Sequence, residues 1–557
     1  MKKKRGISLI VLIITIIVII ILAAAIILTI TKNNPMSSAK EATFKTDIRN
    51  FQDSLAMYIG KEVSVDYYGN REKLSVIDNL GDMDKYITGY NKKKYSDKLG
   101  IESDELVYFP DKVTKDEKKW LDDLGIKPYG NSVKVASEDI FIWDENDTNK
   151  IIGYNKDLFE QYILDNNNIL KFPDRCVTLG EGAFFNCTLI ENLVMNNNIT
   201  KIEKGCFNLC SNLKSVKFSD NITYIGRSAF SSCENLKSIK LPKELKIIDE
   251  QAFTNCTSIV NIEFPQELEK INSGAFESCH GLTELIIPNS VNYLGSRVFS
   301  SCLNLSKIKL SDNISALYSS LFSYCGNLKQ VELPKNLEGI YYEAFYGCNL
   351  ESIDIPEGTK EIGTWVFESC DNLKSVNLPS TISKIDCTAF DKCQSLKEIN
   401  VSNSNSYYTS EDGILFNKDK TKIIRYPAGL ENEEYVIPDS VKIVGENAFS
   451  YSKYLKNITS MSGVNKLCGY SFEYCENLNN IVLSDNLNTI EYYSFSGCKN
   501  LKKIILPSSL TIIGERAFQD CYNLKYIYCR ASKASDGWDN NWKLYCYANV
   551  IWGYTGD

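Results

Sequence analysis

Phenylalanine recurs along this chain of 557 residues with a period that favours one kind of architecture. It stands at fourteen positions from Phe184 to Phe518, and the step is 23 residues except for one step of 22 and one of 59. The positions are Phe184, Phe207, Phe230, Phe253, Phe276, Phe299, Phe322, Phe345, Phe367, Phe390, Phe449, Phe472, Phe495 and Phe518. A fixed period in the twenties predicts a solenoid, in which each repeat contacts only its neighbours.

The repeat that begins at Leu236 shows how one unit would fold. Ile239 and Leu241 alternate with polar residues, as in a strand with one buried face. Pro242 has no amide hydrogen and ends that strand. Phe253 fills the bend that follows. Because one unit cannot cover its own apolar face, we expect neighbouring units to stack and cover it.

These residues, with Leu, Ile, Pro, Ala, Phe and Cys at set offsets over about 170–530, resemble the BspA-type leucine-rich repeat family. The resemblance implies a β-rich solenoid of about fourteen coils of 23 residues, ten in 170–400 and four in 434–530. It also implies a bacterial surface protein of a group implicated in binding host matrix proteins and cells.

Two further segments complete the predicted solenoid. Residues 401–433 interrupt the repeat and hold two apolar segments, Ile414–Phe416 and Ile423–Ile424, so a β-hairpin insertion is expected there. Residues 531–557 are rich in aromatic residues and are expected to form a C-terminal cap, since an open solenoid end must be covered.

The N-terminus predicts a membrane anchor. The run from Ile7 to Ile30 has no charge and would reach roughly 36 Å as a helix, enough to cross a bilayer. Lys2–Arg5 is basic and should stay cytoplasmic, which places the rest of the chain outside. Residues 1–32 are therefore expected to form a leader and transmembrane helix of a single-pass protein at the bacterial cell surface.

This leader resembles that of type IV prepilins, in which a basic stretch ends in glycine before a long apolar helix. The resemblance implies cleavage after Gly6 and methylation of the new N-terminus at Ile7. Val11 departs from the pattern, because that family carries a glutamate at the fifth mature position. A removable secretory signal and an unprocessed anchor remain the alternatives.

Residues 33–169 link the leader to the repeats. Apolar residues recur at helical spacing from Ala42 to Ile59, so 33–60 is predicted as an amphipathic helix. Residues 61–169 are predicted as a small α+β connector. It would contain a helix over Thr114–Gly125 and strands near residues 107–109 and 140–143.

Nineteen cysteines raise three alternatives. Thirteen of the fourteen phenylalanines have a cysteine three residues later, one per coil, whereas zinc sites use short paired spacings. Disulfides suit an exported protein, but side chains stacked in one column point the same way and join poorly. Buried free thiols, acting as small apolar residues, are the favoured interpretation, and no metal site is expected.

The composition disfavours most enzymes. The chain has one histidine, His280, which removes most Ser-His-Asp and Cys-His chemistry. Cys279 precedes it but belongs to the periodic column. We predict no enzyme activity and no cofactor. A net charge of -8 also makes nucleic acid a poor partner.

The outward-facing strand residues are the predicted interaction surface, because solenoids bind partners on extended faces. The candidate binding residues are Lys240, Glu263, Glu284, Lys309, Glu332 and Asp354. The expected function is an adhesion or protein-binding module whose partners are proteins at the cell exterior, host matrix and cell-surface proteins among them. The alternative is a pilin-like structural subunit or filament-tip protein, with pilus or secretion machinery as partner.

Overall fold

The computed structural model describes residues 99–102, 105–108, 112–113, 115–128 and 140–556, and the chain divides into two compact units between Lys134 and Val135. The predicted leader, the predicted helix over 33–60, and the processing residues Gly6 and Ile7 lie outside the described residues. Within the described ranges, no helix has the length and apolar character to cross a bilayer.

The described residues of the first unit form a small sheet and a helix. Strands β1 (Leu99–Glu102), β2 (Glu105–Tyr108) and β3 (Lys127–Pro128) form the sheet in that order. Helix α3 (Lys115–Asp123) confirms the predicted helix. It ends before Gly125, whose positive φ of 72° suits a residue without a side chain.

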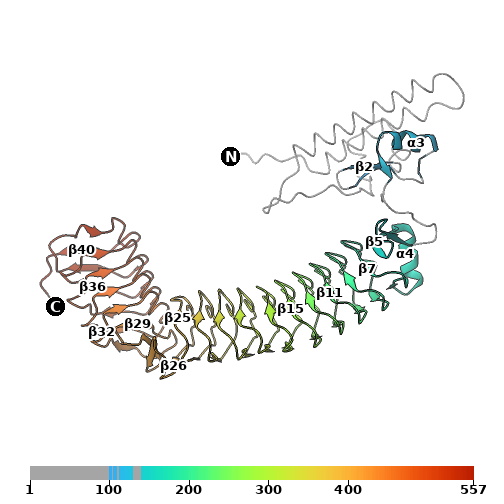
Figure 1. The fold of residues 1–557 in the computed structure, drawn as a ribbon. Coiled ribbons are helices and arrows are strands. Elements are labelled where there is room, and N and C mark those ends of the chain that lie inside the picture. Colours follow the sequence, from blue (N-terminus) through green and yellow to red (C-terminus); the bar gives the residue numbers. More distant parts are fainter. Residues whose placement is uncertain (1–98, 103–104, 109–111, 114, 129–139, 557) are drawn as a thin grey trace, which may run out of the picture. The chain divides into compact units, whose positions relative to one another are not determined.

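The second unit is a β-solenoid of about 17 turns (Figure 1). Each turn contributes a first strand to one face of the solenoid, which we call the leading face. Most turns also contribute a second strand to another face, which we call the return face. The leading-face strands are β6 (Ile169–Lys171), β8 (Asn192–Val194), β10 (Ser215–Lys217), β12 (Ser238–Lys240), β14 (Asn261–Glu263), β16 (Glu284–Ile286), β18 (Lys307–Lys309), β20 (Gln330–Glu332), β22 (Ser352–Asp354), β24 (Ser375–Leu378), β26 (Glu398–Val401), β30 (Glu434–Val436), β32 (Asn457–Ser460), β34 (Asn480–Ile481), β36 (Lys503–Leu506), β38 (Tyr526–Cys529) and β40 (Asn549–Trp552).

The return face is built from short strands that pair in parallel with their neighbours wherever pairing occurs between turns. These strands are β7 (Thr178–Leu179), β9 (Lys201–Ile202), β11 (Tyr224–Ile225), β13 (Ile247–Ile248), β15 (Lys270–Ile271), β17 (Tyr293–Leu294), β19 (Ala316–Leu317), β21 (Gly339–Ile340), β23 (Glu361–Ile362), β25 (Lys384–Ile385), β31 (Ile443–Val444), β33 (Lys466–Leu467), β35 (Thr489–Ile490), β37 (Ile512–Ile513) and β39 (Gly537–Trp538).

The N-terminal end of the solenoid is covered by a hairpin and a helix. Strands β4 (Phe141–Trp143) and β5 (Lys150–Tyr154) pair antiparallel, and β5 continues the return face by pairing with β7. Helix α4 (Lys156–Asp165) follows, and its Phe159 and Ile163 are buried in the same core as the first repeats. The solenoid core therefore begins at Phe141, upstream of the predicted first repeat.

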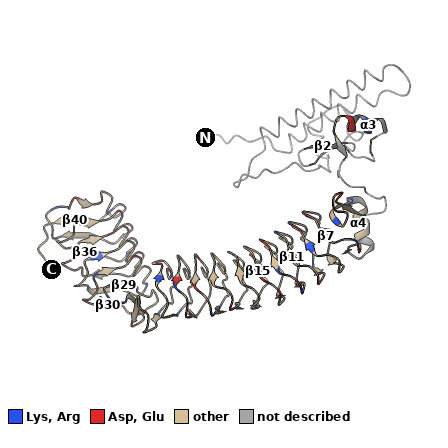
Figure 2. Ribbon diagram, viewed as in Figure 1, with Lys and Arg blue, Asp and Glu red and all other residues tan. Residues whose placement is uncertain are grey.

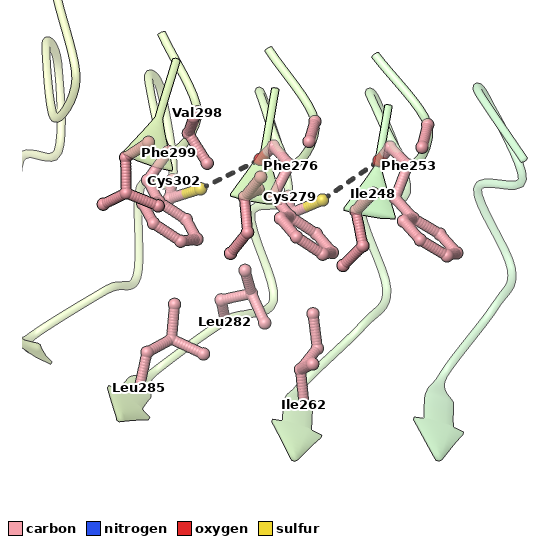
Figure 3. Close-up of a cluster of buried hydrophobic side chains, with 14 of the residues drawn as sticks. Ile248, Phe253, Ile262, Phe276, Cys279, Leu282, Leu285, Val298, Phe299 and Cys302 are labelled. Carbon is pink, nitrogen blue, oxygen red and sulfur yellow. Dashed lines mark hydrogen bonds between the residues drawn. The ribbon is translucent and has the colours of Figure 1, made fainter. Parts of the chain in front are cut away.

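The turn around Phe253 shows how the pattern packs (Figure 3). In β12 the central Ile239 is buried, and the residues on either side of it are exposed. Phe253 is fully buried, and its ring stacks on Phe230 and Phe276 with centroids 5.4 and 5.3 Å apart. Such stacks add stabilisation to the area that the rings bury, so the phenylalanine period is the packing period of the core.

The periodic cysteines are buried thiols, as expected. All nineteen cysteines are free, and seventeen are buried. Cys279 Sγ donates to the carbonyl oxygen of Phe253 at 3.2 Å, and Cys302 Sγ donates to that of Phe276 at 3.3 Å (Figure 3). These two thiols each add a hydrogen bond to a buried phenylalanine carbonyl of the preceding turn, which also accepts the backbone N–H of that turn's cysteine.

The predicted count of fourteen coils is corrected to about 17 turns. Phenylalanine marks fourteen turns, but the turns that begin with β26, β38 and β40 lack it. Tyr426 takes its place after β26, with its ring 4.9 Å from that of Phe449. Trp542 contacts Phe518 at 5.8 Å in the turn of β38. The segment expected as a cap therefore supplies further turns.

The predicted hairpin insertion contains three strands. They are β27 (Tyr408–Glu411), β28 (Ile414–Asn417) and β29 (Lys422–Arg425). β28 pairs antiparallel with both β27 and β29, and β29 also pairs in parallel with β31. The insertion is thus part of the return face. The two buried clusters of the solenoid meet here, since Leu415 belongs to one and Ile414 to the other.

Candidate binding face

The leading face displays one residue on each side of a buried central residue in most turns. In β12, β14 and β18 the pattern is exposed, buried, exposed. Adjacent strands pair in register within each sheet, so equivalent residues form columns along the solenoid. Two columns result, one before and one after the central residue.

The six predicted residues are all exposed on this face, although they do not form one column. Lys240 lies beside Glu263, and Lys309 lies beside Glu332, both in the column after the central residue. Asp354 occupies the same position in β22. Glu284 stands before the central residue and pairs in register with Lys307.

Basic and acidic residues are interspersed along this part of the solenoid (Figure 2), and several of them contact one another. Lys309 Nζ lies 3.2 Å from the Glu332 carboxylate, and Asn377 donates to Asp354 at 2.5 Å. These exposed contacts join successive turns and contribute little free energy each. The predicted residues therefore form a mixed, solvated surface with no concentration of one charge.

The column after the central residue becomes apolar towards the C-terminus. Val436, Val482 and Ile551 are 58%, 49% and 38% exposed, and Ile505 and Tyr528 between them are partly exposed. Ile505, Tyr528 and Ile551 are in direct register across β36, β38 and β40. We call the side chains of Val482, Ile505, Tyr528 and Ile551 the apolar stripe.

A pocket opens in the apolar stripe where the leading face is interrupted. β34 and β36 belong to different sheets, although the return strands β35 and β37 of the same turns remain paired. The pocket has a volume of about 320 Å³. It is lined by Asn480, Ile481, Val482, Leu483, Asp485, Lys503, Ile504, Ile505, Pro507 and Arg530.

Lys503 and Arg530 line this pocket, and Lys502 and Lys525, whose backbones are hydrogen-bonded to each other, immediately precede β36 and β38. Lys502, Lys503 and Lys525 are exposed, and no acidic partner stands within ion-pair distance of them among the residues that the structure describes. Arg530 pairs with Asp485 at 3.1 Å. Elsewhere many lysines pair with an acid of the preceding turn, as Lys374 does with Glu351 at 3.1 Å. The C-terminal turns therefore present uncompensated positive charge beside exposed apolar groups.

The candidate residues predicted from the sequence end at Asp354, so the apolar stripe was not among them. The signal is present in the sequence, because Val482, Ile505 and Ile551 each follow the apolar central residue of a repeat. The interruption between β34 and β36 has no such signal. It depends on strand pairing that residue types alone do not determine.

The cysteines and the histidine offer no reactive arrangement. Burial raises the pKa of Cys325 to about 12 and holds that of Cys279 well above its ordinary value, so neither favours the nucleophilic thiolate. His280 Nδ1 lies 2.8 Å from the Ser301 carbonyl oxygen. Among the described residues, no group of three or more His, Cys, Asp or Glu side chains is placed to hold a metal ion.

A buried arginine is the second feature that the sequence reasoning missed. Arg425, in β29, is 1% exposed and forms an ion pair with Asp391. Both residues lie where the insertion joins the turns, in a cluster that includes Ser450. The hydrogen bonds of Arg425 join residues inside the solenoid core, so the cluster stabilises the fold.

The repeats match one family model, described as the BspA type leucine rich repeat region, over residues 149–260, 246–374, 316–432 and 428–535. No curated protein matches the chain.

Solved structures with similar folds include a leucine rich cell surface protein from Faecalibacterium prausnitzii, at 24% identity and a TM-score of 0.39, with 75% of this chain and 93% of that chain covered. A leucine-rich repeat protein from Bacteroides ovatus has 21% identity and a TM-score of 0.46, with 71% and 97% covered. The pneumococcal vaccine antigen PcpA has 21% identity and a TM-score of 0.34, with 69% and 76% covered.

Proposed function

The chain belongs to the BspA type leucine rich repeat family of bacterial surface proteins, and on that premise we propose that it is displayed outside the membrane and binds other proteins through its leading face. The proposal covers adhesion, with host matrix or cell-surface proteins as candidate partners. The solenoid supports it by presenting a long row of exposed side chains on paired strands.

The observation that carries the protein-binding role is the change of character along the leading face. Apolar side chains occupy the column after the central residue over successive C-terminal turns, and two of them, Val482 and Ile505, line a pocket. The equivalent positions in the first turns are mostly charged, with Val194 and Ile286 as apolar exceptions. Grouped exposed apolar residues mark interaction surfaces in soluble domains. A solvated surface with no partner would be expected to keep charged residues in this column throughout.

Site-specific photo-crosslinking on intact cells tests this function. A photoreactive residue is placed at Lys240 or Val482 on the leading face and, as the matched control, at the exposed Lys270 on the return face. We expect protease-sensitive adducts from at least one leading-face position and none from position 270. Absence of adducts from both leading-face positions, or adducts that resist protease and yield to glycosidase, would contradict a protein partner.

The leader supplies the means of display in this proposal. Ile7–Ile30 is long and apolar enough to span a bilayer, and the basic Lys2–Arg5 orients it with the solenoid outside. Cleavage after Gly6 would leave Ile7 as the first residue. N-terminal sequencing of the mature protein tests this step: Ile7 supports prepilin-type processing, while Met1 supports an unprocessed anchor.

A pilin-like or filament-tip role remains the second candidate, because the leader carries the glycine and the long apolar run that resemble those of prepilins. Recovery of the protein in sheared filaments, together with Ile7 at its N-terminus, would favour this role. Val11 stands where a glutamate assists subunit assembly in pilins, so we expect the sheared fraction to lack the protein.

A further inference from the structure

The apolar stripe runs across the strands and not along one of them. Ile505, Tyr528 and Ile551 follow one another in register on β36, β38 and β40, and Val482 precedes them in the neighbouring turn. Strands in a sheet lie about 4.8 Å apart, so these four side chains cover roughly 14 Å along the solenoid axis. A ligand that contacts all four must extend along that axis.

The shape of the surface favours a helical ligand. The backbone groups of β36, β38 and β40 pair within their sheet, so a strand laid across this face would leave its own N–H and C=O groups unpaired. An α-helix satisfies its backbone internally, and its pitch of about 5.4 Å is close to the spacing of the rows. One apolar helix face can therefore follow the apolar stripe over about three turns.

The interruption between β34 and β36 does not admit an extra strand. The return strands β35 and β37 of the same two turns pair directly, Thr489 with Ile512 and Ile490 with Ile513, which keeps the turns one strand spacing apart. The pocket of about 320 Å³ instead suits one large side chain that projects from the ligand. Ile481, Val482 and Pro507 supply its apolar lining.

The charges near the apolar stripe indicate which side chains should border the apolar face of such a helix. Lys502, Lys503 and Lys525 have no acidic partner among the residues that the structure describes, and Arg530 has one, Asp485. The chain as a whole is acidic, with a net charge of -8, so this local excess of positive charge has the opposite sign to the net charge of the protein. Carboxylates on the ligand would compensate it and would also speed association.

We propose that the leading face of the turns from β34 to β40 binds an acidic amphipathic helix of a partner protein, with one large apolar side chain in the pocket. This inference rests on the proposed protein-binding function and names the partner's chemistry and the place of contact. An anionic membrane and a second copy of this chain are the occupants against which it must be tested.

The probe is a fluorescent 18-residue peptide of leucine, alanine and glutamate, with leucines spaced to form one helical face. It is titrated with the purified full-length protein and followed by anisotropy. We expect saturable binding. We expect at least tenfold weaker binding when the leucines are scrambled, when lysine replaces every glutamate, or when salt is raised from 50 to 500 mM.

Variants of the protein locate the site. Lys503→Glu with Lys525→Glu should weaken binding at least tenfold, and so should Val482→Asp, whose side chain is 49% exposed. The matched control is Lys270→Glu with Lys442→Glu, a pair of exposed lysines in or beside the return strands β15 and β31, which should leave binding unchanged. Circular dichroism confirms that each variant is folded.

Several outcomes overturn the inference. They are no binding of the acidic peptide, equal binding of the scrambled peptide, and an equal loss in the Lys270 and Lys442 control. Binding to vesicles with 30% anionic lipid but not to the peptide assigns the surface to a membrane, and self-association by sedimentation that Val482→Asp abolishes assigns it to a second copy. If crosslinks form at Lys240 while the peptide fails, the proposed function stands and this inference falls.

Discussion

Arg425 and Asp391 form an ion pair inside the solenoid, with Arg425 Nη1 2.7 Å from Asp391 Oδ1, although the two residues are 34 positions apart in the chain. Arg425 Nη2 also donates to the Phe390 carbonyl oxygen at 3.0 Å. In ordinary turns a cysteine 26 residues further on bonds that carbonyl, as Cys302 does for Phe276. In the turn after Phe390, Tyr426 takes the phenylalanine position, and Gly429 stands three residues later, where it offers no thiol. Arg425 donates to the Phe390 carbonyl oxygen in its place.

Arg425→Met is expected to destabilise the protein by about 3–5 kcal/mol, because it leaves the buried Asp391 carboxylate without its cation. Burial already raises the pKa of Asp391, and the Arg425 guanidinium opposes that rise. Without the arginine the carboxyl should stay protonated to a higher pH, so the loss should be larger at pH 8 than at pH 5. Urea unfolding followed by circular dichroism measures both values.

The double variant Arg425→Met with Asp391→Leu is the control for this cluster. Replacing both members of a buried pair with apolar groups is often nearly neutral, so the double variant should recover part of the stability that Arg425→Met loses. A single variant within about 0.5 kcal/mol of the wild-type protein would show that the pair does not stabilise the junction.

Phe276→Ala is expected to cost about 3–5 kcal/mol, since it leaves a cavity in a continuous stack of rings. Its neighbours Phe253 and Phe299 lie 5.3 and 5.9 Å away by ring centroid and are themselves fully buried, which limits how far they can move to fill the space. The shift of the urea midpoint measures the loss. Lys240→Ala, on the exposed leading face, should stay within about 0.5 kcal/mol, and a near-neutral Phe276→Ala would contradict the repeat register.

The seventeen buried thiols are expected to react with iodoacetamide only when the protein unfolds. Burial raises the pKa of the thiols of Cys302 and Cys498 well above the ordinary value, so thiolate is scarce and inaccessible in the folded state. Cys387 and Cys468, the two that are only partly buried, should be the first to react at pH 8. Mass spectrometry of labelled peptides gives the order.

The same labelling experiment tests the redox state of the column. In denaturant without reductant, nineteen labels are expected, because the structure holds every cysteine as a free thiol. A count near zero would mean disulfides and would contradict the role of the Sγ atoms as donors to phenylalanine carbonyls.

The sequence predicts the repeating part of this fold well because one residue type reports one packing position. Phe253 and Cys256 mark the bend of their turn, and equivalent residues mark the bend of most other turns. A stacked core leaves few other arrangements for these residues. The prediction of the number of turns was wrong for the same reason. Tyr426 and Trp542 occupy core positions without the phenylalanine that defined the count.

The candidate binding face was only half predictable. Alternation in the strands correctly placed Lys240 and Glu263 outside, since side chains of a strand point to opposite faces. The pocket between β34 and β36 depends on where strand pairing fails, and the role of Arg425 depends on how the insertion shifts the following turn. Both are tertiary effects that no local pattern encodes.

Glu473 gives the solenoid a pH dependence that a single substitution should remove. Burial, with a further contribution from the nearby Asp391 charge, raises the pKa of Glu473 to about 7 from an ordinary value of 4.5, and Lys392 opposes the rise. Because the folded protein holds this proton more tightly than the unfolded chain, the stabilisation is complete below about pH 4.5 and is lost as pH rises through about 7. Glu473→Gln should therefore be more stable than the wild-type protein at pH 8, by about 1–2 kcal/mol because the side chain is only partly buried.

Urea midpoints at pH 5 and pH 8 measure the difference. Glu234→Gln, at an exposed position, is the control and should change the stability equally little at pH 5 and at pH 8. If Glu473→Gln gains no more stability at pH 8 than Glu234→Gln does, Glu473 ionises without cost in the folded protein.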